Sequence, residues 1–258
     1  MTKIARYPQG QISWIELASA DPAGSSAFYH ALLGWQGESM RGPSGPYTRF
    51  FSQGAPVAGM TGLSPDASWQ RASWSCYFSV DDAAATVEAA TKLGAKVVMA
   101  ATQVGAAGRM AILSDPQGVR FSLWQAQEHL GSAIINEPGS MCWHVCATPN
   151  AQGAIEFYKG LFGLIPSPPN ANVPGYHELR NSERPLYGVL QLGRVSETFP
   201  ACWNPYITVA DCDASTARAL ELGAELIEES HATGRTRLSI LRDPQGAPFR
   251  LMQRAAAQ

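Results

Sequence analysis

Hydrophobic and polar positions along the chain form short blocks that follow one another in a fixed order. Residues 12–18 alternate between apolar and polar as a strand does, and residues 22–33 then carry apolar side chains at helical spacing. Asp21 is suited to cap the start of this helix and Gly34 to end it. Two further strands are predicted after the helix, at 47–51 and 57–63.

The same order of blocks then starts again. The pattern predicts a strand at 74–80 and a helix from about residue 82 to 93. Three strands are predicted after that helix, at 96–100, 109–113 and 121–125. The first half of the chain is therefore predicted to contain two strand–helix–strands modules.

The second half repeats the first with a period of 129 residues. The stretch FYHALLGW at 28–35 matches FYKGLFGL at 157–164, and 157 − 28 = 129. The same offset relates Trp14 to Trp143, and the chain length of 258 is twice 129. We therefore expect a tandem duplication of one domain. The predicted parts are a first domain at 1–127, an exposed linker at 128–139 with polar composition, and a second domain at 140–258.

Composition excludes several classes of function. Lys plus Arg is 19 and Asp plus Glu is 21, so the net charge of −2 gives no basic field for nucleic acid. Neither an apolar run long enough to cross a membrane nor a secretory signal is visible in the sequence. Five cysteines fit a cytoplasmic protein with reduced thiols, and the strand spacing of Cys142 and Cys146 places them too far apart, on one face, for a disulfide.

Motifs shared by both halves resemble a known superfamily. A first strand leads to Asp21 or Asn150, and a Phe-Tyr-x-x-Leu-x-Gly helix follows. Val-x-Asp, Leu-Gly-Ala and Asp-Pro-Gln-Gly then recur in both halves. This set resembles the vicinal oxygen chelate superfamily, which includes glyoxalases and bleomycin-resistance proteins. The resemblance implies an α+β fold of two tandem glyoxalase-like domains, each made of paired βαβββ modules whose curled mixed sheets form a cleft.

The stretches 74–80 and 203–209, both Trp-x-x-Tyr-x-x-Val, further resemble a two-domain subgroup often called hydroxylases or glyoxalase-like antigens. In active enzymes of the superfamily, His, Gln or Glu side chains hold a divalent metal. The matching positions are Trp14, Ser75 and Ser122 in the first domain and Trp143, Asn204 and Arg250 in the second. Because an indole only donates hydrogen bonds and a guanidinium repels cations, we expect neither a metal nor another cofactor.

Strand parity indicates which other side chains face the clefts. Glu16 has the parity of Trp14, and Tyr77 has that of Ser75, so both should face the first cleft, where Trp124 adds aromatic surface. Glu16 is interpreted either as a carboxylate with a structural partner or, with Tyr77, as a catalytic base.

The second cleft is expected to present a different set of side chains. Tyr206 lies on the same strand as Asn204 and has its parity, so both should face this cleft. Arg250 has three interpretations: it receives an anionic ligand, pairs with an acid such as Glu178, or is a solvated cation at a strand end.

Three functional hypotheses follow. The first is metal-independent binding of a small aromatic or apolar metabolite, since aromatic walls with few polar groups are typical of ligand sites. The second is a metal-independent isomerase, lyase or cyclase that uses Glu16 as its base. The third, a metal-dependent dioxygenase or lactoylglutathione-lyase-like enzyme with displaced ligands, is favoured least. The expected partner is a small molecule, and the expected state is a monomer or homodimer.

Overall fold

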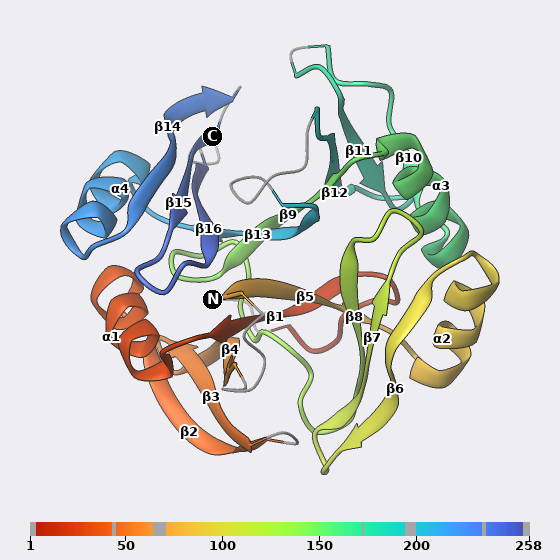
Figure 1. The fold of residues 1–258 in the computed structure, drawn as a ribbon, viewed down its shortest axis with the longest axis horizontal. Helices are drawn as coiled ribbons and strands as arrows, with labels where there is room; N and C mark the ends of the chain where they lie inside the picture. The colour runs from red at the N-terminus through yellow and green to blue at the C-terminus, as the bar shows by residue number, and fades with distance from the viewer. Residues whose placement is uncertain are drawn as a thin grey trace.

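Each half of the chain folds into one curled, eight-stranded mixed sheet with two helices (Figure 1). The computed structural model describes residues 4–42, 45–63, 71–171, 173–193, 200–233 and 236–254. The strand order is β2-β3-β4-β1-β5-β8-β7-β6 in the first half and β10-β11-β12-β9-β13-β16-β15-β14 in the second. The predicted α+β fold with two tandem domains is confirmed.

The elements of the first half are β1 (Ile12–Ser19), α1 (Pro22–Leu33), β2 (Gln36–Gly42), β3 (Gly45–Ser52), β4 (Ala55–Gly62), β5 (Ser73–Ser79), α2 (Ala83–Lys92), β6 (Lys96–Val104), β7 (Gly108–Ser114) and β8 (Arg120–Ala126). Those of the second half are β9 (Met141–Thr148), α3 (Ala151–Phe162), β10 (Ile165–Pro166), β11 (Tyr176–Arg180), β12 (Pro185–Gln191), β13 (Cys202–Thr208), α4 (Cys212–Glu221), β14 (Glu225–Thr233), β15 (Thr236–Arg242) and β16 (Pro248–Arg254).

Local chemistry fixes where the helices begin. The side chains of Asp21, Asp82, Asn150 and Asp211 each accept a hydrogen bond from the backbone N–H three residues on. Helix α1 ends at Gly34 and α3 at Gly163, both in the left-handed conformation that glycine adopts without strain. The helices are at most 12 residues long, and none of those described could cross a membrane.

The edge strand that follows the first helix of each half, β2 and β10, escaped the sequence pattern. Strand β2 is an edge strand of largely exposed residues, Gln-Gly-Glu-Ser-Met-Arg-Gly, and pairs only with β3. An edge strand that buries neither face shows no apolar alternation, so the hydrophobic pattern could not predict it.

The two halves pack through their convex faces around one shared core. Strand β5 contacts β13 between the sheets, helix α1 lies beside α4, and α2 lies beside α3 (Figure 1). The core contains buried side chains from both halves, and Phe78 stacks on Tyr158 and contacts Trp203. The concave faces of the two sheets therefore lie on opposite sides of this core.

The segment joining the halves is more buried than its composition predicted. Ile134 is 1% exposed and Ser132 is also buried. The backbone N–H of Ser132 donates to Ser13 O, and that of Ala133 donates to Pro56 O, which ties the segment to the first sheet. The expectation of an exposed linker was wrong because its scattered apolar residues pack against the sheet it crosses.

The prediction that Cys142 and Cys146 share one face of their strand was wrong. All five are free, but Cys142 and Cys146 do not share a face. A register shift in the pairing of β9 with β13 falls at Cys142, so its side chain contacts the concave cluster while Cys146 lies in the shared core. Simple strand parity fails at such a shift.

Candidate functional site

An aromatic cluster covers part of the concave face of the first domain. Trp14, Tyr77 and Trp124 pack together apart from the shared core, with Met110 and Val104 beside them. Trp14 on β1 pairs in register with Tyr77 on β5, which pairs with Ser122 on β8. The three aromatic side chains expected at this cleft are thus brought together, whereas Trp74 and Cys76 lie in the core, as parity predicted.

Glu16 lies next to this cluster and is held by hydroxyl groups. Its register partner is Ser75, and the hydroxyl of Tyr77 donates to Glu16 Oε1 at 3.0 Å. Tyr47 also hydrogen-bonds Glu16, and its hydroxyl accepts from Trp14 Nε1 at 3.1 Å. Burial raises the pKa of the Glu16 carboxyl, and the two tyrosine hydrogen bonds offset part of that rise.

Three residues of this face were missed by sequence reasoning as site candidates: Tyr47, Arg49 and His129. Tyr47 could have been found from the repeat, because Tyr176 stands 129 residues later and accepts from Trp143 Nε1 in the same way. Arg49 lies in register with Gly59, which is also the partner of Glu16, so the acid and the cation flank one glycine. Arg49 Nε is buried and has no hydrogen-bond partner in the described part of the chain.

His129 comes from the joining segment, where no strand pattern could place it. Its ring meets Trp14 edge-on at 4.5 Å between centroids, and its backbone oxygen accepts from Trp124 Nε1. Burial lowers the pKa of its imidazole to about 4, and the charge of Arg49 acts in the same direction. The ring is therefore neutral near pH 7, and its Nε2 is buried without a partner among the residues that the structure describes.

The concave face of the second domain carries other chemistry. Val145, Tyr206 and Met252 form its cluster, with Trp143 and Tyr176 packed against it. Asn204 pairs in register with Val145, and its amide donates to the backbone oxygens of Val145 and Cys202. Trp203 belongs to the core, as parity predicted.

Arg250 is neither a solvated strand-end cation nor the partner of Glu178. It pairs in register with Tyr206 in the middle of β16 and is 7% exposed. Its guanidinium lies over the Tyr206 ring, 5.9 Å from the centroid, and donates a hydrogen bond to the Tyr206 hydroxyl. Nη1 has no hydrogen-bond partner among the described residues. Within the described residues, no ion pair joins it to Glu178.

The donors at the superfamily's metal positions do not fit a divalent cation. Trp14 and Trp143 present an N–H, Arg250 presents a positive charge, and the amide oxygen of Asn204 accepts from Cys202 Sγ. In the described part of the chain, no three His, Cys, Asp or Glu side chains are grouped so that they could hold a metal ion.

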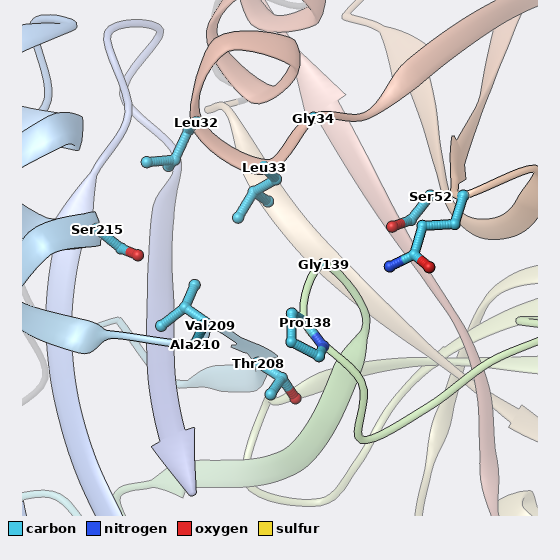
Figure 2. Close-up of a pocket in the computed structure, with 11 residues that line it drawn as sticks. Leu32, Leu33, Gly34, Ser52, Pro138, Gly139, Thr208, Val209, Ala210 and Ser215 are labelled. Atoms are coloured by element: carbon cyan, nitrogen blue, oxygen red, sulfur yellow. The ribbon is translucent and has the colours of Figure 1, made fainter. Parts of the chain in front are cut away.

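A cavity of about 320 Å³ lies elsewhere, where the halves meet. Leu32 and Leu33 at the end of α1 line it opposite Val209 and Pro138 (Figure 2). At the pseudo-equivalent position, Phe162 replaces Leu33 and stacks on Phe78 at 5.0 Å. The cavity is therefore lined by Leu33 where the other half has the larger Phe162. Its described lining carries no titratable group.

Comparisons with known proteins support the duplication. A family model described as glyoxalase-like domain matches residues 14–124 and again residues 143–252. The putative glyoxylase CFP32 of Mycobacterium bovis is 32% identical over 263 residues and covers 100% of both chains. The anthracycline biosynthesis protein DnrV of Streptomyces peucetius is 32% identical over 266 residues, covering 97% of this chain and 95% of its own.

Solved structures share the fold at low identity. The Mn(II)-bound glyoxalase from Novosphingobium aromaticivorans is 18% identical with a TM-score of 0.67, covering 95% of this chain and 82% of its own. The 2,3-dioxygenase LapB from Pseudomonas sp. KL28 is 14% identical with a TM-score of 0.64, covering 99% and 94%. The chain belongs to the glyoxalase-like domain family, as a tandem of two such domains within the vicinal oxygen chelate superfamily.

Proposed function

We propose that the chain binds a small aromatic ligand, without a metal, on the concave face of the first domain. The observation that carries this proposal is an aromatic cluster set apart from the core and bordered by buried polar atoms without partners, Arg49 Nε and His129 Nε2. Buried polar groups are normally satisfied, so unsatisfied ones beside an aromatic surface favour a ligand site.

The ligand would enter beside Glu16. Trp14 and Trp124 are 3% and 6% exposed, because His129 and Met110 pack against them. Tyr47, Glu16, Ser75 and Arg49 are only partly buried. Together these residues offer hydroxyls, a carboxyl and a cation to a ligand whose ring would rest against the aromatic cluster.

An enzyme that uses Glu16 as a base is the second candidate. The raised pKa of Glu16 and the 3.0 Å contact from the Tyr77 hydroxyl favour it. The carboxyl, however, already accepts hydrogen bonds from two tyrosines, which is better suited to holding a ligand than to abstracting a proton. A relative's name places it in anthracycline biosynthesis, and this makes an anthracycline the first probe for both candidates.

The test is titration with an anthracycline and with 1-naphthol, followed by tryptophan fluorescence and by thermal unfolding with and without EDTA. Free ligand at 100 times its dissociation constant should add about 2.7 kcal/mol of stability, and EDTA should change nothing. Glu16→Gln should weaken binding, whereas Glu178→Gln, at a partly buried acid on the other concave face, should not. Binding that requires a metal, or no binding by either probe, would contradict the proposal. Substrate turnover lost in Glu16→Gln with binding intact would favour the enzyme.

A further inference from the structure

The concave face of the second domain contains a cation that the described part of the chain does not neutralise. Arg250 is 7% exposed, its Nη1 has no hydrogen-bond partner, and none of the ion pairs between described residues includes it. Guanidinium groups remain charged inside proteins, and a buried charge without a partner is costly. A protein retains such a group most readily where a ligand supplies the missing anion.

No acidic side chain among the described residues forms an ion pair with Arg250. Tyr206 lies beneath the guanidinium and its hydroxyl accepts a hydrogen bond from Arg250, which leaves the positive charge unneutralised. The amide of Asn204 is committed to backbone oxygens. Glu178 faces the same side from β11, but no ion pair joins it to Arg250 within the described residues. The charge of Glu228 on β14 contributes to the raised pKa of Tyr206, and Glu228 is itself engaged in another interaction.

The repeat shows that this charge is specific to one domain. The position of Arg250 is Ser122 in the first domain, and the position of Glu16 is Val145 in the second. Arg49 of the first face corresponds to Glu178 of the second, so each face carries one acid and one cation at different positions. Only β4 lies between the strands of Glu16 and Arg49, whereas β12, β9 and β13 lie between those of Glu178 and Arg250. An acidic ligand bound beside Arg250 would be attracted by the guanidinium, with three strands separating it from the acid of that face.

Aromatic surface on the same concave face as Arg250 is accessible. Trp143 is partly exposed, in contrast to Trp14 at 3%, which His129 covers in the first domain. Tyr176 is also partly exposed and holds the Trp143 ring through a 3.0 Å hydrogen bond from Nε1. A planar ring could stack here while its acid group reaches the guanidinium.

We propose that the concave face of the second domain is a separate binding site for small aromatic carboxylates. Arg250 binds the carboxylate, and Trp143 and Tyr206 contact the ring. This site takes an anionic ligand, so it differs from the first domain's site in both position and ligand class.

The experiment is an NMR titration of the full chain with benzoate and with benzamide, which has the same shape but no charge. Benzoate should bind and benzamide should bind at least tenfold more weakly, since hydrogen bonds to charged groups are the strong ones. Arg250→Met should weaken benzoate by about 10- to 100-fold. Arg218→Met, an exposed arginine on α4, should leave benzoate binding unchanged.

A second variant separates binding from folding. Arg250→Lys keeps the charge but loses the planar fork, and should bind benzoate with intermediate affinity. Equal binding of benzoate and benzamide, no binding of benzoate, or full benzoate affinity in Arg250→Met would each overturn the proposal. If Arg250→Met fails to fold, Arg250→Lys alone decides. The proposal is then overturned if Arg250→Lys binds benzoate with full affinity and binds benzamide equally well. Loss of anthracycline binding alone would affect only the first domain's site.

Discussion

At the scale of residues, the two concave faces differ by a few substitutions on matched positions. Glu16 and Ser122 in the first domain correspond to Val145 and Arg250 in the second. Each substitution changes charge at a buried or half-buried position, where its electrostatic effect is larger than at the surface. The two scaffolds therefore place their charges differently. Glu16 and Arg49 flank one glycine on the first face, whereas three strands separate Arg250 from Glu178 on the second.

The protonation of Glu16 should appear in the pH dependence of stability. Because burial raises its pKa, the folded chain holds this proton more tightly than the unfolded chain does. The wild type should therefore lose stability relative to Glu16→Gln as pH rises from the ordinary value of 4.5 through the higher pKa of the folded state. Urea unfolding of both proteins from pH 4 to pH 8 measures this difference.

Glu88→Gln, on the exposed face of α2, serves as the control and should follow the wild type at every pH. If the stability of the wild type relative to Glu16→Gln stays constant or increases as pH rises, Glu16 is ionised in the folded protein without cost.

Much of the site followed from parity, and the remainder depended on tertiary contacts. Trp14, Tyr77 and Trp124 could be placed on one face because strand alternation dictates it. His129 could not, since a segment outside any strand brings it onto Trp14. The environment of Arg250 was also beyond the sequence, because a strand position alone does not reveal whether a guanidinium finds a partner.

At the scale of elements, a glycine in the middle of each sheet creates room for a Trp–Tyr hydrogen bond. A Cβ at Gly59 on β4 would overlap the Tyr47 hydroxyl and lie 2.9 Å from Trp14 Nε1. Gly188 on β12 stands in the same relation to Tyr176. Glycine within a strand usually weakens it, so its presence at both matched positions indicates a close approach that the side chains require.

Gly59→Ala should therefore displace Tyr47 and disturb the hydrogen bonds around Glu16. We expect a loss of about 1–3 kcal/mol in the free energy of unfolding, which is typical of overpacking. Adding Tyr47→Phe removes the nearest overlapping atom and should restore part of that loss, giving a non-additive double mutant. Gly62→Ala on the same strand, whose Cβ would make only an ordinary 3.4 Å contact with Pro22, should cost less. Additive losses would show that Tyr47 is not the obstacle.

At the scale of the molecule, motifs of one half pair with motifs of the other. The hydroxyl of Tyr29 on α1 donates to Asp243 Oδ2 at 2.9 Å, and that of Tyr158 on α3 donates to Asp115 Oδ2 at 3.2 Å. The duplicated sequence predicted two copies of one fold and the modules within each. It could not predict that the Phe-Tyr helix of each half would pack on the Asp-Pro-Gln-Gly turn of the other, because the repeat is equally consistent with pairing inside a half.

These crossed contacts should make the two halves unfold as one unit. Tyr29→Phe leaves Asp243 Oδ2 without this donor and removes the acceptor of Trp74 Nε1, so it should lower the free energy of unfolding by about 1–3 kcal/mol. Tyr158→Phe should do the same for Asp115 and Trp203. Calorimetry should show one transition in the wild type and in both variants, with equal calorimetric and van't Hoff enthalpies. Tyr176→Phe, which breaks a bond within one sheet, controls for the loss of a hydroxyl. Two separable transitions, with only one of them moved by Tyr29→Phe, would show instead that each half is stable without the other and that the shared core contributes little to cooperativity.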